Sequence, residues 1–228
     1  MSDISENINL LKEELPGNVK LIAVSKTKTV DEIKEAYDNG HRFFGENRVQ
    51  ELLGKYEKLP RDIKWHMVGH LQRNKVKYIA GFIHMIESVD SEKLLRAVNK
   101  EAMKVRRIID CLLQFHIARE ETKFGFSKEE AVQMIESGVL DELSNVNIRG
   151  VMGMATFTDD MDRVREEFAY LRSVFEELKE KYFHQKEDFC EISMGMSGDY
   201  KVALEEGSTM VRIGTLIFGA RYCKTGIN

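Results

Sequence analysis

The sequence has few cysteines and prolines, no long apolar run and no excess of positive charge. Its three cysteines, Cys111, Cys190 and Cys223, lie far apart and form no CxxC pair, which argues against a disulfide framework and a cysteine zinc site. No stretch approaches the ~18–20 apolar residues that span a bilayer. The first residues contain no basic segment followed by an apolar one, so no signal peptide is predicted. We expect a reduced, soluble, cytoplasmic protein.

The net charge limits the possible partners, and the lack of a linker-like segment limits the number of domains. Lysine and arginine number 34 against 38 aspartates and glutamates, giving a net charge of −4. Non-specific nucleic-acid binding needs a basic face, so nucleic acid is not an expected partner. The chain has two prolines, no repeat and no low-complexity linker. A single domain over residues 1–228 is therefore predicted, a usual length for an α/β barrel.

Short β-rich runs alternate with helical patterns along the chain. The predicted strands cover residues 19–25, 42–45, 64–69, 82–87, 108–117, 147–152, 188–194 and 209–214. The predicted helices cover residues 30–39, 47–58, 71–80, 91–105, 127–137, 160–183 and 199–206, after a first helix with Ile4, Ile8, Leu11 and Leu15 on one side. Eight strands separated by helices fit a parallel sheet and favour a closed (β/α)8 TIM barrel, with an open doubly wound sheet as the alternative.

In such a barrel the functional groups are expected where the strands end. Lys26 follows the first strand in "LIAVSKTKTV", and "FGENR" brings Glu46 and Asn47 after the second. Glycine-rich segments follow the last two strands: "SMGMSGD" over residues 193–199 and "RIGT" over residues 212–215. Glycine turns, a serine hydroxyl and a helix start favour anions, and the loops after strands seven and eight commonly bind phosphate in this fold.

Lys26 is the candidate reactive group. A lysine at a strand end usually reaches solvent, and its amine, with an ordinary pKa of about 10.4, is unreactive while protonated. Desolvation or nearby positive charge lowers that pKa enough for a Schiff base to form with a carbonyl. A phosphate cradle across the barrel mouth and Arg212 nearby predict a phosphorylated aldehyde as the ligand. Pyridoxal 5′-phosphate (PLP) is the commonest cofactor of this kind.

Three long segments resemble one known family. "AVSKTKTVDEIKEAYDNGHRFFGENRVQE", "WHMVGHLQRNK" and "ISMGMSGDYKVALEEGSTMVRIGTLIFGAR" are similar to the PLP homeostasis proteins (the YggS/PROSC family), single-domain relatives of the alanine racemase N-terminal barrel. The resemblance runs from about residue 5 to residue 222. It implies a protein that binds PLP and keeps its cellular supply balanced, in the cytoplasm and without robust turnover. PLP-dependent apoenzymes are candidate recipients, and a monomer is favoured.

The resemblance also implies roles for six residues. Lys26 matches the lysine that holds PLP as a Schiff base, and Arg212 matches the arginine that faces the pyridine nitrogen. Ser197, Gly214 and Thr215 match the phosphate-binding positions, and Asn47 lies in the ring-side FGEN motif. Two positions leave the family pattern, so their roles stay open: His70, and His116 in Gln114-Phe115-His116, where relatives commonly read "QVN".

Whether the Lys26 amine does chemistry depends on a second base. An arginine opposite the ring nitrogen cannot accept its proton, which leaves the ring a weaker electron sink than a carboxylate would. The related racemases use a tyrosine from a separate C-terminal domain, which this sequence does not contain. Tyr200 and Tyr222 are the tyrosines nearest the cradle, and packing is the favoured role for both. We expect a tether without robust turnover; the alternatives are a small PLP-dependent amino-acid racemase and a Schiff-base aldolase without PLP.

Several other candidates have simpler interpretations. His66 and His70 have HxxxH spacing, but "WHMVGH" is predicted as a strand entering a turn, so no metal site is expected. Glu46 is a candidate general base, although a carboxylate just before a helix is more often a cap. Trp65 is predicted to pack in the core. Cys111 and Cys190 lie in strand runs and are predicted to be buried.

Overall fold

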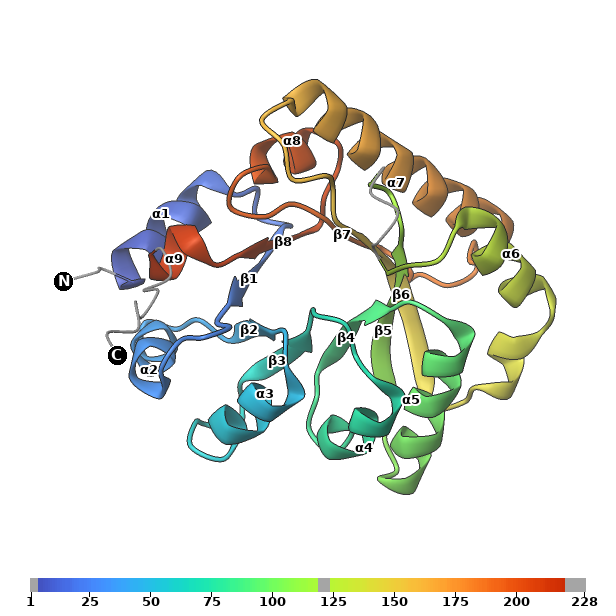
Figure 1. The fold of residues 1–228 in the computed structure, drawn as a ribbon, viewed down its shortest axis with the longest axis horizontal. Coiled ribbons are helices and arrows are strands. Elements are labelled where there is room, and N and C mark those ends of the chain that lie inside the picture. The colour runs from blue at the N-terminus through green and yellow to red at the C-terminus, as the bar shows by residue number, and fades with distance from the viewer. Residues whose placement is uncertain (1–3, 119–123, 220–228) are drawn as a thin grey trace, which may run out of the picture.

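Eight parallel strands close into a barrel with helices on its outside (Figure 1). The computed structural model describes residues 4–118 and 124–219. The strands are Lys20–Val24 (β1), Phe43–Glu46 (β2), Lys64–Met67 (β3), Met85–Val89 (β4), Ile109–Phe115 (β5), Val146–Gly153 (β6), Glu191–Ser193 (β7) and Met210–Ile213 (β8). Each strand pairs with the next along the chain, and β8 pairs with β1. The predicted (β/α)8 barrel is confirmed, and the open doubly wound sheet is excluded.

The helices follow the strands in the predicted alternation. They are Ile4–Glu14 (α1), Val30–Asp38 (α2), Val49–Tyr56 (α3), Val76–Ile79 (α4), Glu92–Lys104 (α5), Lys128–Glu136 (α6), Met161–Lys181 (α7), Tyr200–Glu205 (α8) and Thr215–Phe218 (α9), with 3₁₀ turns at Arg73–Lys75 (η1) and Val139–Glu142 (η2). Three predicted elements had clearly wrong bounds. The helix over 71–80 is the short pair η1 and α4, and the strands over 82–87 and 188–194 each begin three residues later.

Local sequence explains where the main helices begin. Thr29 and Glu32 form a capping box at α2, and Ser127 and Glu130 form another at α6. The Ser91 side chain accepts a hydrogen bond from an amide in the first turn of α5. These caps satisfy amides that would otherwise lack partners.

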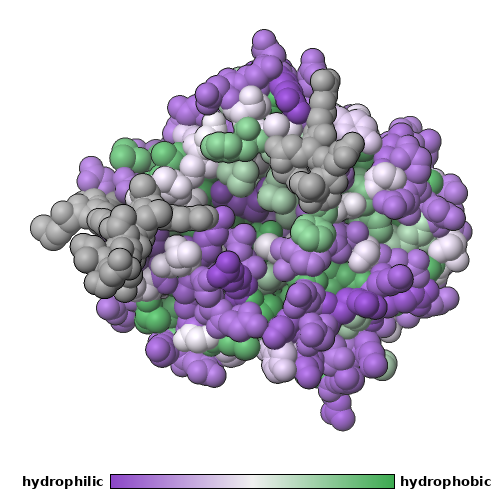
Figure 2. Space-filling view, viewed as in Figure 1, coloured by the Kyte–Doolittle hydropathy of each residue, from purple (hydrophilic) through white to green (hydrophobic). Residues whose placement is uncertain are grey.

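The hydrophobic stripe predicted for the first helix faces the core. In α1, Ile4, Ile8 and Leu11 are buried, and Leu15 just beyond the helix is buried as well. The helix flanks the barrel beside α9 and does not plug it (Figure 1). Trp65 is completely buried, as predicted. On the face drawn in Figure 2, hydrophilic residues predominate and hydrophobic ones form small groups.

The barrel interior contains an apolar layer beneath the carboxyl ends of the strands. Met85, Leu112, Met152 and Met210 form this cluster, with Met154 packed against it. Because side chains two residues apart on a strand share a face, the inward position that follows Met210 is Arg212. The interior therefore changes from apolar to polar along the barrel axis, and the polar part lies next to the site.

Candidate functional site

A cavity of about 500 Å³ opens at the carboxyl ends of the strands. All six residues predicted to bind the cofactor line it: Lys26, Asn47, Ser197, Arg212, Gly214 and Thr215. They come from four places far apart in the sequence, namely the segments after β1 and β2, the loop after β7, and β8 with the turn that follows it. The structure therefore brings the whole predicted set to one cavity.

The backbone that carries Lys26 is fixed on both sides of that residue. The Thr27 amide donates to Oε2 of Glu51 in α3 over 2.9 Å, and Thr27 has a φ of 66°. On the other side, Oγ of Ser25 donates to Oε1 of Glu46 over 2.6 Å. A positive φ is costly for a β-branched residue, so it persists here because the surrounding contacts hold the turn. Lys26 is thus presented from a constrained turn at the cavity wall.

Glu46 neither caps a helix nor lines the cavity. It is completely buried at the end of β2, and Nζ of the buried Lys55 donates to its Oε1 over 2.6 Å. The residue at the N-cap of α3 is Arg48, so the capping role expected for Glu46 was wrong. Burial raises the pKa of the Glu46 carboxyl, and the charge of Lys55 opposes that rise. The contacts make Glu46 part of the support beneath the Lys26 turn.

The cradle is built from turns more than from helices. Ser197 lies in the loop before α8, while Gly214 and Thr215 lie where β8 passes into α9. Because α8 has six residues and α9 four, their dipoles contribute little. The groups suited to an anion are the hydroxyls of Ser197 and Thr215 and the amides of the turns. Asp199 also lines the cavity, and burial raises its pKa.

The position of Lys26 relative to this cradle differs from the expectation. The cradle was expected across the barrel mouth from the lysine. Closure of the barrel pairs β1 with β8, in register at Ala23 and Ile213, so the turn at Gly214 lies beside the end of β1. A Cβ added at Gly214 would lie 3.2 Å from the carbonyl oxygen of Val24. The sequence could not show this, because only closure makes the first and last strands neighbours.

Arg212 is a buried cation in the cavity wall. Its side chain is 3% exposed, Nη1 donates to Oγ of Ser193 over 2.5 Å, and Nη2 donates to the carbonyl of Gly153 over 2.8 Å. Burial lowers the pKa of the guanidinium, while the charges of Glu87 and Asp199 raise it. Since arginine stays protonated in proteins, Arg212 presents a fixed positive donor to the cavity.

Asn47 supplies a polar atom that has no partner. Its Oδ1 is buried and makes no hydrogen bond, although the residue lines the cavity. Gly69 packs against its backbone: a Cβ there would lie 2.5 Å from the Asn47 carbonyl oxygen. A buried acceptor without a partner is costly, so a ligand with a donor would be favoured beside it. This observation fits a polar ligand in the cavity.

The sequence interpretation missed one wall of the cavity. The segment between β6 and α7 contributes Thr156, Phe157, Thr158 and Asp159, and Met161 follows at the start of the helix. Glu167 anchors it by accepting hydrogen bonds from the amide and hydroxyl of Thr156 at 2.6 and 2.7 Å. Phe157 is 98% exposed at this wall. In the sequence, this segment is marked only by its position after "MGM", because "ATFTDD" itself matches no anion-binding pattern.

Other candidates lie away from the cavity. His70 bonds Asp90 through Nδ1 at 2.9 Å and stacks on Phe124, and it borders a separate hollow. Gln114 donates to the Phe124 carbonyl, and neither it nor His116 lines the cavity. Tyr200 is buried, and its hydroxyl donates to Glu14.

Three further expectations concern residues outside the site. Cys111 is buried as predicted, but Cys190 is exposed, because β7 begins only at the following residue, Glu191. Tyr222 and Cys223 lie outside the described residues. Within residues 4–118 and 124–219, no group of three or more histidine, cysteine, aspartate or glutamate side chains could hold a metal ion. In the same part of the chain, none of the helices has the length and apolar character required to traverse a bilayer.

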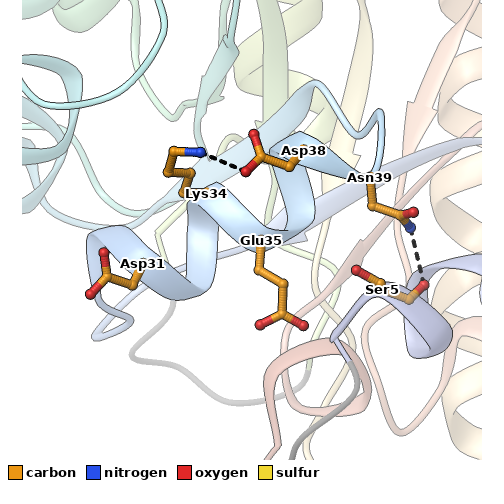
Figure 3. A pocket seen from close by; sticks show the side chains of 6 residues that line it. All are labelled: Ser5, Asp31, Lys34, Glu35, Asp38 and Asn39. Atoms are coloured by element: carbon orange, nitrogen blue, oxygen red, sulfur yellow. Dashed lines mark hydrogen bonds and ion pairs between the residues drawn. The ribbon is translucent and has the colours of Figure 1, made fainter.

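Another hollow, of about 520 Å³, lies between α1 and α2 (Figure 3). Nζ of Lys34 donates to Oδ2 of Asp38 over 2.6 Å, and the side-chain amide of Asn39 donates to the Ser5 carbonyl over 3.2 Å. The remaining carboxylates there point away from one another in the figure. None of the six predicted residues lies in this hollow.

Comparison with known proteins places the chain in a family. Residues 1–222 match the family model described as alanine racemase, N-terminal domain. A pyridoxal phosphate homeostasis protein of Aquifex aeolicus (strain VF5) is 41% identical over 203 residues, covering 89% of this chain and 87% of the relative. The Homo sapiens protein of the same name is 39% identical over 218 residues, covering 89% and 76%. The fold class is that of the alanine racemase N-terminal barrel.

Within that class, the chain belongs to the pyridoxal phosphate homeostasis protein family, and the predicted resemblance is confirmed. The structure of PipY from Synechococcus elongatus PCC7942, solved with PLP bound, has a TM-score of 0.87 and 35% identity over 95% of this chain and 100% of that one. Alanine racemase of Clostridium difficile 630 has a TM-score of 0.79 at 15% identity, covering all of this chain and 59% of that one. The second likeness shows a shared fold.

Proposed function

We propose that this protein binds PLP reversibly, attached as a Schiff base to Lys26, and serves PLP homeostasis in the cytoplasm by holding and delivering the cofactor. The observation that carries the proposal is the convergence of the six predicted residues on one cavity of about 500 Å³. The relatives named PLP homeostasis proteins and the PLP-bound PipY structure support it.

The residues present fit this cofactor. PLP carries an aldehyde, a phosphate and a pyridine ring. The cavity offers an amine to the aldehyde, a hydroxyl-lined turn to the phosphate and a buried cation to the ring. The buried Asn47 Oδ1, which has no partner in the protein, suits a donor on the ligand. The apolar side chains of Val24 and Val68 also line the cavity and suit a ring face. When bound, PLP would supply an aldehyde that reacts reversibly with an amine.

Each part of the site then has a physical task. Lys26 supplies the amine from a turn that is fixed on both sides, so little conformational freedom is lost when the bond forms. Ser197, Gly214 and Thr215 supply hydroxyl and amide donors for the phosphate. Arg212 would serve as the donor at the pyridine nitrogen and could not take up its proton. This arrangement holds the cofactor firmly and activates it weakly, which suits a carrier better than a catalyst.

Robust turnover is not part of the proposal. Among the described residues, the cavity lining contains no tyrosine and no histidine that could act as a second base. The racemases at 15–16% identity support a shared fold alone. We therefore favour a monomeric carrier, built as a single barrel domain, whose recipients are PLP-dependent apoenzymes.

Reconstitution with PLP followed by borohydride reduction tests the proposal. The protein should turn yellow, and reduction should fix the mass of one pyridoxyl phosphate on the peptide that contains Lys26. Lys28 also lines the cavity, and its Nζ donates to the Phe218 carbonyl over 2.7 Å. It serves as an internal comparison because both lysines meet the same reagent. Label on Lys28 instead, or a protein that stays colourless, would contradict the proposal.

A further inference from the structure

Four buried side chains form one connected chain through the barrel interior, and Arg212 is its end at the cavity. Nη1 of Arg212 donates to Oγ of Ser193 over 2.5 Å, and that hydroxyl donates to Oε2 of Glu87 over 2.6 Å. Oε1 of Glu87 lies 2.6 Å from Nδ1 of His66. All four residues are at most 4% exposed. These residues lie on β8, β7, β4 and β3, so the hydrogen bonds connect four strands across the inside of the barrel.

The donor and the acceptor of each hydrogen bond in this series can be assigned. A hydroxyl has a single hydrogen, and Ser193 gives it to Glu87, so its oxygen accepts from Arg212. An ionised carboxylate only accepts, so His66 donates through Nδ1. Burial tends to raise the pKa of Glu87, but the hydrogen bond from His66 and the charge of Arg212 outweigh it and leave that pKa below its ordinary value.

The surroundings make the charge of Glu87 effective at Arg212. Oε2 of Glu87 lies 3.8 Å from Nη1 of Arg212, and neither side chain is more than 3% exposed. Met85 and Met210, each two residues before one of these groups on its strand, belong to the apolar layer beneath. With water largely absent, the two charges are weakly screened. Further titratable groups lie near these four side chains: Asp199, toward Arg212, and the His84 ring, whose centroid lies 5.4 Å from that of His66. Lys26, Lys28 and Asp159 line the same cavity as Arg212.

We infer that Glu87, acting through Ser193, is a positioning residue that orients Arg212 and offsets its charge where the guanidinium faces the cofactor ring. The inference rests on the proposed PLP site. With Glu87 in place, the buried pair carries no net charge, so the ring meets an oriented donor. Without that carboxylate, the same guanidinium would present an uncompensated positive charge to the cavity.

A purely structural role for the pair of Glu87 and Arg212 predicts a different experimental outcome. A buried ion pair that only supports the barrel would affect unfolding when it is broken, and it would leave the bound cofactor's spectrum unchanged. A pair that sets the potential at the cofactor would shift the pH at which the cofactor's visible absorption changes. The spectrum therefore separates the two roles.

The test compares Glu87→Gln with the wild-type protein, both loaded with PLP and titrated by visible absorption. Glutamine keeps the size of the side chain and removes its charge. A more positive potential disfavours protonation of the bound cofactor, so the midpoint of the absorption change should fall by about one pH unit. Ser193→Ala breaks the bridge and keeps both charges, so its midpoint should fall by less.

Glu191→Gln is the matched control. Glu191 is also a buried barrel glutamate, but it bonds Lys20 and Thr209 and has no contact with Arg212. Its midpoint should equal that of the wild type. Should Glu87→Gln fail to fold, Ser193→Ala decides the question. Midpoints unchanged in the folded, loaded variants would overturn the inference, whereas a wild-type protein that takes up no PLP would instead contradict the proposed function.

Discussion

Nζ of Lys55 lies 2.6 Å from Oε1 of Glu46, and the pair supports the turn that carries Lys26. The same ammonium donates to the Ser25 carbonyl over 2.7 Å, while the Ser25 hydroxyl donates to Glu46. Two charges removed from water are costly unless each has its partner and further hydrogen bonds. Here both the side chain and the backbone of Ser25 provide those bonds, so Lys26 follows a residue held by a buried ion pair.

Replacing Lys55 should therefore destabilise the barrel strongly. Lys55→Met leaves the Glu46 carboxylate buried without its counterion, and we expect the free energy of unfolding to fall by about 3–5 kcal/mol in urea denaturation. The double variant Lys55→Met, Glu46→Gln removes both charges and should lose clearly less than the sum of the two single variants. Additive losses would show that the two side chains do not depend on each other.

The two glycines of the cradle loop should respond differently to the same substitution. Gly195 has a φ of 95°, and a Cβ there would lie 2.6 Å from Cβ of Ala203, whereas a Cβ on Gly198 meets nothing within 4 Å. Gly195→Ala should thus displace the loop, cost about 1–3 kcal/mol of stability and weaken PLP binding. Gly198→Ala is the matched control for the steric effect and should be as stable as the wild type in urea unfolding, because its Cβ meets no protein atom. Equal stabilities of the two variants would contradict the steric account.

The fold was largely predictable because its signals are local. Alternating strands and helices identify a parallel sheet, and the stripe of Ile4, Ile8 and Leu11 identifies an amphipathic first helix. The segment around residues 71–80 was not predictable in detail. A helical pattern there is divided between a 3₁₀ turn and one α-helical turn, and periodicity alone does not separate those outcomes.

The candidate site was predictable only where its residues belong to contiguous motifs. Lys26 and Ser197 lie in segments whose sequence points to a ligand, and the structure brings them to one cavity. Glu87 carries no such signal, because its partner Ser193 is 106 positions away and meets it only across the closed barrel. Phe157 was missed for a different reason: an exposed aromatic residue in a loop resembles ordinary surface until the cavity is seen.

The protein loaded with PLP should not exchange the α-hydrogen of amino acids. Exchange requires a base and a ring that stabilises the carbanion, and an arginine opposite the ring nitrogen would leave the ring a weak electron sink. Inversion would require a further base on the second face, and Tyr200, the described tyrosine nearest the cradle in sequence, is held by Glu14 over 2.8 Å. We expect proton NMR of alanine and other common amino acids in deuterated water to show no exchange above that of free PLP. Exchange by the wild type that disappears in Lys26→Ala would instead favour the racemase alternative.

His41 should make the barrel less stable as the pH falls. The side chain is 3% exposed, its Nε2 donates to the Phe43 carbonyl over 2.8 Å, and burial lowers its pKa from 6.5 to about 4. Between these two values the unfolded chain binds a proton that the folded protein does not, so stability decreases as the pH falls through that range. From pH 7 to pH 5 this one group should remove about 2 kcal/mol.

The variant His41→Gln isolates this contribution, because glutamine can keep a donor for the Phe43 carbonyl and does not titrate. Urea unfolding of both proteins at pH 7 and pH 5 gives the difference that belongs to His41. His84, with a pKa also lowered to about 4 by burial, acts in the same direction and remains in both proteins. The variant should therefore lose about 2 kcal/mol less than the wild type between the two pH values. Equal losses would mean that His41 takes up its proton in the folded barrel as readily as in the unfolded chain.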